Sequence, residues 1–331
     1  MAINLAFFGL VKEPFKPTPD PAFLCPTPGH DEALAHLVYG VTERKGFMLL
    51  TGEVGTGKTT LLRALMQQLG DHTAVALVTH SGLPFDGLVE CIMDGFGIAK
   101  PGQSLAQQLL ALRGFLMDRL HAGQNAVVIL DEAQNLTPET LEQIRLLSNF
   151  ETSSDKILQI VLAGQPELAA TLEQPTLRQF EQRIALRCRI VPLTSSETRE
   201  YIQTRLRIAG ATTAGIFTDE AIDRIARSTR GVPRLINNLC DYCLVIGYAD
   251  QIRRVDRKIV DEALRYFSRT SRRGTSLRRL LHRRTLVWIS AAGVAVAASV
   301  AAMRLNVVEV LGAYSTHLTD LVRSMRDLVM R

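Results

Sequence analysis

The stretch GEVGTGKT at residues 52–59 constrains the fold of this chain more than any other. It follows the apolar run GFMLL and precedes TTLLRALMQQL, whose apolar residues have helical spacing. A G-x-x-x-x-G-K-[ST] turn between a strand and a helix presents backbone N–H groups at the helix start, where they can surround phosphate oxygens. The flanking strand and helix argue against a chance glycine-rich turn. The pattern predicts a phosphate-binding loop on a sheet flanked by helices.

The phosphate loop, residues 52–59, predicts ATP as the ligand and Mg²⁺ as its companion ion. Lys58 is expected to contact the β- and γ-phosphate oxygens, and Thr59 to ligate Mg²⁺. The backbone of the loop and of the first helical turn is expected to hold the nucleotide. The expected binding residues are Gly52, Glu53, Val54, Gly55, Thr56, Gly57, Lys58, Thr59 and Thr60.

The stretch AVVILDEAQ at residues 126–134 supplies the expected catalytic acids. Its apolar residues indicate a buried strand, which ends at Asp131 and Glu132. We expect Asp131 to hold Mg²⁺ through water, and Glu132 to orient and deprotonate the attacking water. A solvated acidic turn is the alternative, and the phosphate loop upstream argues against it.

Two further positions fit a site that hydrolyses a phosphoanhydride. Gln165 ends the run IVLAG and is expected beside the γ-phosphate if its strand lies between the other two; a simple strand cap is the alternative. Arg178, Arg183 and Arg187 lie between two predicted strands, and phosphoryl transfer gains rate from an arginine given by a neighbouring subunit. Arg183 is the favoured candidate and Arg178 the second, unless all three form surface or interface ion pairs.

Short apolar runs alternate with helical segments over the first 194 residues, which predicts a doubly wound α/β domain with a parallel sheet. The expected strands are 46–52, 73–79, 125–132, 157–164 and 187–193. After Pro192 only helices are expected, which predicts a small all-α domain. They are 195–209, 218–229, 232–249 and 256–267.

The net charge of +5 is concentrated in eight arginines between residues 265 and 284, so the rest of the chain sums to −3. These arginines adjoin an apolar run, where they would face anionic lipid, so nucleic acid is not the expected partner. The five scattered cysteines indicate a reduced compartment. Cys240 and Cys243 are expected in a helix core, because no second pair completes a zinc site.

Residues 286–303 are free of charge and reach the ~18–20 residues that a membrane-spanning helix needs. A buried helix is the alternative. Six arginines in 272–284 predict a single-pass inner-membrane protein with its N-terminal side in the cytoplasm. The tail, residues 304–331, is then periplasmic. A heptad pattern there predicts a helix that contacts a second copy or a partner, or else lies on the membrane.

The phosphate loop, the D-E strand, the strand-ending glutamine, QRI at 182–184 and GVPRLINNLCD at 231–241 together resemble the AAA+ ATPases. This resemblance implies that Arg234 is a second sensor that reaches the nucleotide from a helical lid. The N-terminal signature PF…TPDPAFL…HDEAL resembles the general secretion pathway protein A family, also called ExeA-like, over residues 3–268. That box is expected either over the adenine side of the nucleotide or merely covering the core.

The resemblance implies an α/β P-loop NTPase fold of AAA+ type with a small all-α lid, to which the apolar run adds one transmembrane helix and a short C-terminal helix. The expected divisions are 1–194 nucleotide-binding domain, 195–268 lid, 269–285 basic linker, 286–303 transmembrane helix and 304–331 periplasmic helix.

The resemblance also implies an ATPase, active as a homo-oligomeric ring such as a hexamer, that serves a bacterial envelope machine for type II secretion, type IV-like pili or exopolysaccharide export. Its expected partners are proteins of that machine, contacted through the C-terminal helix. A DNA-dependent ATPase of the transposition-regulator or initiator type and a nucleotide-switched scaffold are the alternatives.

Overall fold

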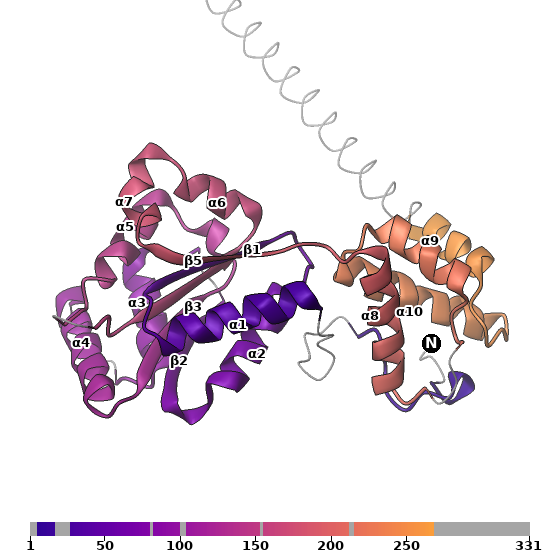
Figure 1. Cartoon of the computed structure of the whole chain (residues 1–331), viewed down its shortest axis with the longest axis horizontal. Coiled ribbons are helices and arrows are strands. Elements are labelled where there is room, and N and C mark those ends of the chain that lie inside the picture. Colours follow the sequence, from indigo (N-terminus) through magenta and orange to yellow (C-terminus); the bar gives the residue numbers. More distant parts are fainter. Residues whose placement is uncertain are drawn as a thin grey trace, which may run out of the picture. The chain divides into compact units, whose positions relative to one another are not determined.

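The computed structural model describes residues 5–16, 27–79, 82–99, 104–152, 155–211 and 215–267. Met1–Ala263 form one compact unit, and Leu264–Arg331 form a second, of which residues 264–267 are described. The first unit contains a parallel sheet flanked by helices and a separate group of helices (Figure 1).

The sheet has five strands, all paired in parallel, in the order β2-β3-β4-β1-β5. They are β1 Phe47–Gly52, β2 Thr73–Val78, β3 Asn125–Leu130, β4 Gln159–Gly164 and β5 Ile184–Ile190. Parallel pairing brings the carboxyl ends of all five strands to one edge. Because β4 lies between β1 and β3, the condition stated for Gln165 is met.

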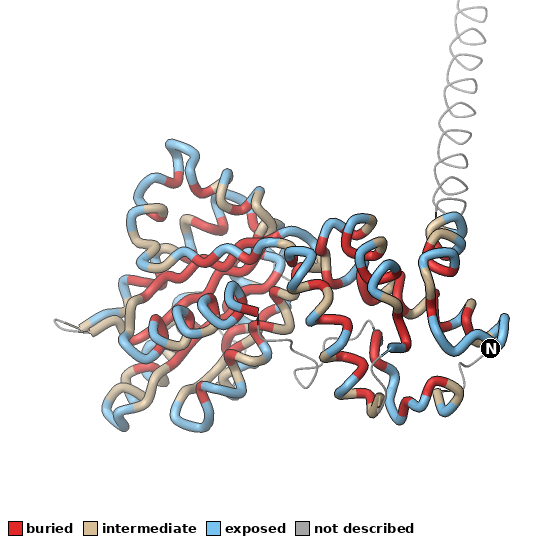
Figure 2. Tube along the Cα trace, turned by 45° about the vertical axis from the view of Figure 1, so that its right-hand side comes forward, coloured by how far each residue is buried: buried red, intermediate tan, exposed pale blue. Residues whose placement is uncertain are grey.

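Helices cover both faces of the sheet, so the three inner strands, β3, β4 and β1, are buried on both sides. One face carries α1 Pro28–Thr42 and α2 Lys58–Leu69; the other carries α3 Phe85–Gly95, α4 Leu105–His121, α5 Pro138–Leu147, α6 Pro166–Leu172 and α7 Arg178–Glu181. Successive residues of β3 alternate between the two cores: Val127 and Ile129 pack with α1 and α2, while Val128 and Leu130 pack with the other group. Buried residues run along the strands in Figure 2. The predicted α/β fold with a parallel sheet is confirmed.

Four helical segments follow β5 in the region predicted to be the lid. They are α8 Ser195–Ile208, α9 Asp219–Thr229, α10 Pro233–Ala249 and a helical stretch at 257–267. Each predicted helix of this region is present. Cys240 and Cys243 of α10 are fully buried, and burial raises the pKa of both thiols, that of Cys243 to about 12. Both therefore serve as core residues, as expected. The domain boundary at 194 stays a prediction.

Residues 5–16, which lead into the N-terminal box at Pro14, contact α8 and the residue that follows it. The backbone N–H groups of Val11 and Lys12 donate to the Ala209 carbonyl at 2.7 and 3.1 Å. Arg205, a buried residue of α8, donates from Nε to the Pro14 carbonyl at 2.7 Å. Farther along the box, Ala33 of α1 is buried in the core on the side of the sheet that carries α2. The two expected positions of the box stay predictions.

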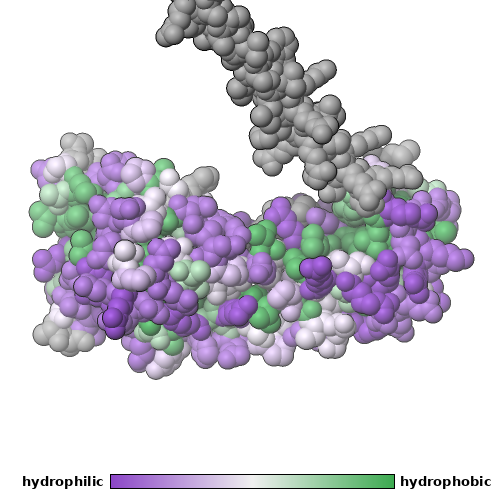
Figure 3. Space-filling view, turned by 90° about the horizontal axis from the view of Figure 1, so that it is seen from above, coloured by the Kyte–Doolittle hydropathy of each residue, from purple (hydrophilic) through white to green (hydrophobic). Residues whose placement is uncertain are grey.

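The surface shown in Figure 3 is largely hydrophilic, with hydrophobic residues in small groups. Large apolar side chains left exposed include Val11 of the N-terminal segment, Val54 of the phosphate loop and Leu235 of the lid. Scattered exposure of this kind is normal for a folded protein.

The predicted placement in the inner membrane is wrong for the part of the chain that the structure describes, where no helix is long and apolar enough to cross a bilayer. The longest helices given there, α4 and α10, have 17 residues each. At 1.5 Å per residue they reach about 26 Å, short of the ~30 Å hydrocarbon core. The linker 269–285, the apolar run 286–303 and the tail 304–331 lie outside the described residues.

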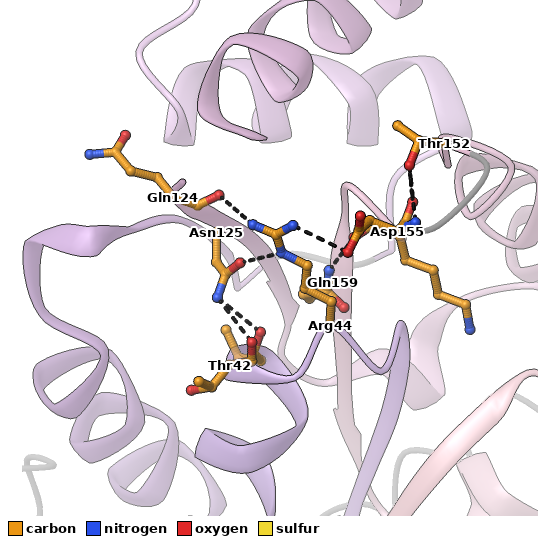
Figure 4. Close-up of polar contacts among 9 residues, drawn as sticks. Thr42, Arg44, Gln124, Asn125, Thr152, Asp155 and Gln159 are labelled. Carbon is orange, nitrogen blue, oxygen red and sulfur yellow. Dashed lines mark hydrogen bonds and ion pairs between the residues drawn. The ribbon is translucent and has the colours of Figure 1, made fainter. Parts of the chain in front are cut away.

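A polar cluster joins the amino ends of three strands (Figure 4). Arg44, in the connection from α1 to β1, donates from Nε to Asn125 Oδ1 at 2.8 Å and from a terminal nitrogen to Asp155 Oδ1 at 3.4 Å. Asn125 in turn donates to the Val41 carbonyl at 3.2 Å. Beside them, the buried Gln159 accepts from the Gly46 backbone N–H at 2.7 Å. The starts of β1, β3 and β4 are thereby tied together.

Candidate functional site

The phosphate loop connects β1 to α2 at the carboxyl edge of the sheet, and two of its glycines have left-handed backbone conformations. Gly55 has φ +82° and Gly57 has φ +105°. Gly52 has no room for a side chain, because an added Cβ would lie 2.8 Å from the Ile190 carbonyl oxygen of β5. The path of the loop therefore depends on glycine at all three positions.

Lys58 begins α2 and its ammonium group turns back onto the loop. Nζ donates to the carbonyl oxygens of Gly52 at 2.7 Å and Glu53 at 3.1 Å. Burial lowers the pKa of Lys58, while the nearby carboxylates, Glu132 first among them, oppose that shift. An ammonium has three N–H donors, so one remains for a phosphate oxygen.

Thr59 and Asp131 lie together, although 72 positions separate them in the sequence. The Thr59 hydroxyl donates to Asp131 Oδ2 at 2.8 Å. Asp131 is 4% exposed, and its backbone N–H donates to the Val78 carbonyl at the end of β2. The hydroxyl and the carboxylate are the oxygen ligands that Mg²⁺ prefers.

The number of protein oxygens at this pair is compatible with Mg²⁺. Among the described residues there is no cluster of three or more His, Cys, Asp or Glu side chains that could hold a metal ion. Mg²⁺ usually keeps several waters and takes one or two protein oxygens with substrate phosphates. Thr59 and Asp131 could supply such protein oxygens.

Glu132 and Gln165 are linked by Gln134, a residue that the sequence interpretation missed. Gln134 donates from Nε2 to Glu132 Oε2 at 2.6 Å and accepts at Oε1 from the Gln165 backbone N–H at 3.0 Å. Glu132 itself is exposed, and its backbone is in the left-handed conformation, with φ 54°. The position of Gln134 two residues after Glu132 was the available signal, and nothing in that spacing shows its contact with β4.

The side chain of Gln165 makes no capping hydrogen bond, although the residue is the N-cap of α6. Its half-buried side chain lies at the end of β4, next to the ends of β1 and β3.

Arg234 lies against the phosphate loop through its backbone. Its N–H donates to the Gly55 carbonyl at 3.1 Å, and a Cβ added to Gly55 would lie 2.6 Å from the Arg234 Cβ. The GVPR turn of the lid therefore adjoins the loop, and the Arg234 side chain is exposed there.

Arg183, which was expected to act on a neighbouring subunit, contacts residues of its own chain here. Its guanidinium donates to Ser148 Oγ and, at 2.9 Å, to Asn149 Oδ1, just after α5. Arg187 pairs with Glu181 at 3.2 Å. Within the described parts of the chain, the exposed Arg178 has no hydrogen bond or ion pair from its side chain.

His30 of α1 also contacts the phosphate loop, and the sequence interpretation missed it as a site residue. Its Nε2 lies 3.0 Å from the Thr56 carbonyl oxygen, and its Nδ1 lies 2.6 Å from the Thr27 hydroxyl. The contact joins residues 26 positions apart, which no local pattern reveals.

Comparisons with known proteins agree with this geometry. Residues 41–172 match the AAA domain family. Over 244 residues the chain is 45% identical to general secretion pathway protein A of Aeromonas hydrophila. That match covers 73% of this chain and 44% of the relative, so the chain spans less than half of the relative's length. The predicted resemblance is confirmed.

Solved structures show the same fold at low sequence identity. The Aeropyrum pernix ORC2 protein in ADPNP-ADP complexes has a TM-score of 0.60 at 18% identity, with 76% of this chain and 71% of that chain covered. The Aeropyrum pernix ORC1 protein in complex with DNA has a TM-score of 0.56 at 19% identity, with 77% and 69% covered.

Proposed function

We propose that this chain, an AAA+ ATPase related to general secretion pathway protein A, binds ATP with Mg²⁺ on its phosphate loop and hydrolyses it to drive or regulate a bacterial envelope machine. The observation that carries the ATPase part is the Thr59–Asp131 pair, with Glu132 beside it at the same strand end.

In this proposal the loop amides and Lys58 bind the phosphates, and Thr59 and Asp131 hold Mg²⁺. The ion, when bound, neutralises phosphate charge. Glu132 accepts the proton of the attacking water, and Gln165 contacts the γ-phosphate from the neighbouring strand end. Arg234 supplies positive charge from the lid side of the loop.

The assignment of Glu132 is tested by Glu132→Gln. The amide cannot accept the proton, so turnover should fall by roughly 10²–10⁴-fold while ATP still binds. Steady-state hydrolysis and nucleotide titration measure the two quantities. Unchanged turnover in Glu132→Gln would remove Glu132 as the base.

We assign the arginine that acts across a subunit contact to Arg178, because Arg183 is engaged by Ser148 and Asn149 of its own chain. This assignment requires a homo-oligomer, for which a ring is the proposed form. Arg178→Ala and Arg183→Ala are a matched pair: only the first should lower turnover strongly at equal ATP affinity. If only Arg183→Ala lowered turnover, Arg183 and not Arg178 would be the arginine that acts across the subunit contact.

The envelope role rests on the relative's name, since it is a protein of the general secretion pathway. Type II secretion, type IV-like pili and exopolysaccharide export are the three machines to test. A deletion strain carrying either the wild-type chain or Glu132→Gln should differ in one of these outputs. Equal output in all three would contradict the envelope role.

DNA-dependent hydrolysis is the second candidate, favoured by the fold shared with an ORC1 protein in complex with DNA. Against it stands the charge of −3 outside residues 265–284. Turnover stimulated by duplex DNA, and losing that stimulation steeply with added salt, would favour this candidate over the first.

A further inference from the structure

The His30 ring is a buried group between the N-terminus of α1 and the phosphate loop, and the proposed chemistry does not use it. The residue is 6% exposed. Both ring nitrogens have partners: Thr27 Oγ1 at 2.6 Å from Nδ1, and the Thr56 carbonyl oxygen at 3.0 Å from Nε2. Thr27 is also the N-cap of α1, so one end of this relay is fixed by the helix.

The partners determine where the proton of the neutral ring lies. A carbonyl oxygen only accepts, so Nε2 carries the hydrogen and donates to Thr56. Nδ1 then accepts from the Thr27 hydroxyl. The relay therefore runs in one direction, from the Thr27 hydroxyl through the His30 ring to the Thr56 carbonyl.

Holding the Thr56 carbonyl also determines the direction of the next N–H in the loop. The Thr56 carbonyl and the Gly57 N–H belong to one peptide plane and, in the trans peptide found here, point in opposite directions. His30 draws the carbonyl toward α1. The Gly57 N–H consequently points away from α1, to the side where a phosphate loop presents its amides.

The fit around this peptide is close. A Cβ added to Gly57 would lie 3.1 Å from His30 Nε2. The Thr56 side chain is fully buried, and its hydroxyl donates to the Glu53 carbonyl at 2.9 Å. Thr56 is therefore fixed by its own hydroxyl on one side and by His30 on the other.

We propose that His30 is a positioning residue that holds the Thr56–Gly57 peptide in its phosphate-binding orientation before nucleotide arrives. The proposal rests on the proposed function, because it assigns His30 to the same phosphate loop. Preorganised donors do not have to be reoriented on binding, so the relay should contribute to nucleotide affinity more than to the rate of the chemical step.

Two conservative variants separate the two ends of the relay. In His30→Gln the side-chain amide reaches the position of Nε2 and can donate to Thr56. In His30→Asn the amide reaches only the position of Nδ1 and can contact Thr27 alone. His30→Ala removes both contacts, and Thr27→Ser is a control that keeps the hydroxyl.

Titration with ADP and Mg²⁺, together with steady-state ATP hydrolysis, tests the proposal on the full chain. His30→Asn and His30→Ala should weaken ADP binding about tenfold. His30→Gln should stay within about threefold of the wild type, as should Thr27→Ser. All four should keep a wild-type kcat at saturating ATP, so that the loss appears in KM.

Melting temperatures identify any variant that fails to fold. If His30→Ala is unfolded, the comparison of His30→Gln with His30→Asn still tests the proposal. The role of His30 would be overturned if His30→Asn bound ADP with wild-type affinity. It would also be overturned if His30→Gln bound ADP no more tightly than His30→Asn. Absence of ADP binding by the wild-type chain would instead contradict the proposed function.

Discussion

The amino and carboxyl ends of the same parallel sheet each carry a cationic side chain, Arg44 at one end and Lys58 at the other. Arg44 has an anion and an amide as partners, Asp155 and Asn125, and ties three strand starts together (Figure 4). Lys58 donates to carbonyl oxygens of its own loop, and its burial lowers its pKa.

The two clusters differ in how far the polar partners of the buried cation offset its loss of hydration. At the amino end the polar groups satisfy one another, so the cluster stabilises the fold. At the carboxyl end an ammonium is kept in a buried position where desolvation disfavours its charge. Two of the three N–H donors of Lys58 hold the loop and the third is left for a phosphate oxygen, which suits binding rather than stability. Substitutions at the two ends should therefore affect different measurements.

The largest effect is expected from Lys58→Ala. Loss of the ammonium removes a direct phosphate contact, so turnover should fall by roughly 10²–10³-fold or more. The free energy of unfolding should not fall, because a desolvated charge is removed with it. ATP hydrolysis and urea denaturation measure the two quantities. A large loss of stability would contradict the contrast between the two ends.

Arg44→Ala should have the opposite pattern. Removing the guanidinium leaves partly buried acceptors without their donor, which should lower the free energy of unfolding by about 1–3 kcal/mol. Alanine keeps a Cβ at the left-handed φ of 51°, so backbone strain stays constant. Urea denaturation measures the loss, and kcat at saturating ATP should be unchanged. A parallel fall in kcat would show that the two ends are coupled.

Asp155→Asn should have the smallest effect. The Asp155 side chain is 41% exposed and lies 3.4 Å from the Arg44 nitrogen, and such half-exposed ion pairs contribute less than about 1 kcal/mol. Asparagine keeps an oxygen acceptor while removing the charge. Denaturation at low and high salt measures the difference, which should shrink with added salt. A difference that persists in high salt would show that a contact other than the ion pair is lost.

The strands were largely predictable because most are buried on both faces and appear as continuous apolar runs. The exception is β5, expected at 187–193 and found at Ile184–Ile190. It is an edge strand in which exposed and less exposed residues alternate, and its exposed Arg187 and Arg189 interrupt the apolar run. An interrupted run of this kind does not mark where the strand begins, and the expected start was three residues too late.

The site was predictable where function depends on a local motif, as for Lys58 and Asp131. It was not predictable where function depends on contacts between distant segments. His30 meets Thr56 only because α1 packs beside α2, and Arg183 turns to Ser148 only because α7 lies near the end of α5. Neither of these two contacts can be deduced from residue type and spacing.

The strand order has a consequence for the chain during its synthesis. The central strand β1 pairs with β4 and β5, whose residues come more than a hundred positions later. At roughly 5–20 residues per second, β1 waits on the order of ten seconds for its first neighbour to leave the ribosome. Its apolar residues Met48 and Leu50, fully buried in the finished sheet, have no strand partner in that interval. Premature termination before β4 would therefore yield an aggregation-prone fragment, in which the β2–β3 pair forms but β1 has no neighbouring strand.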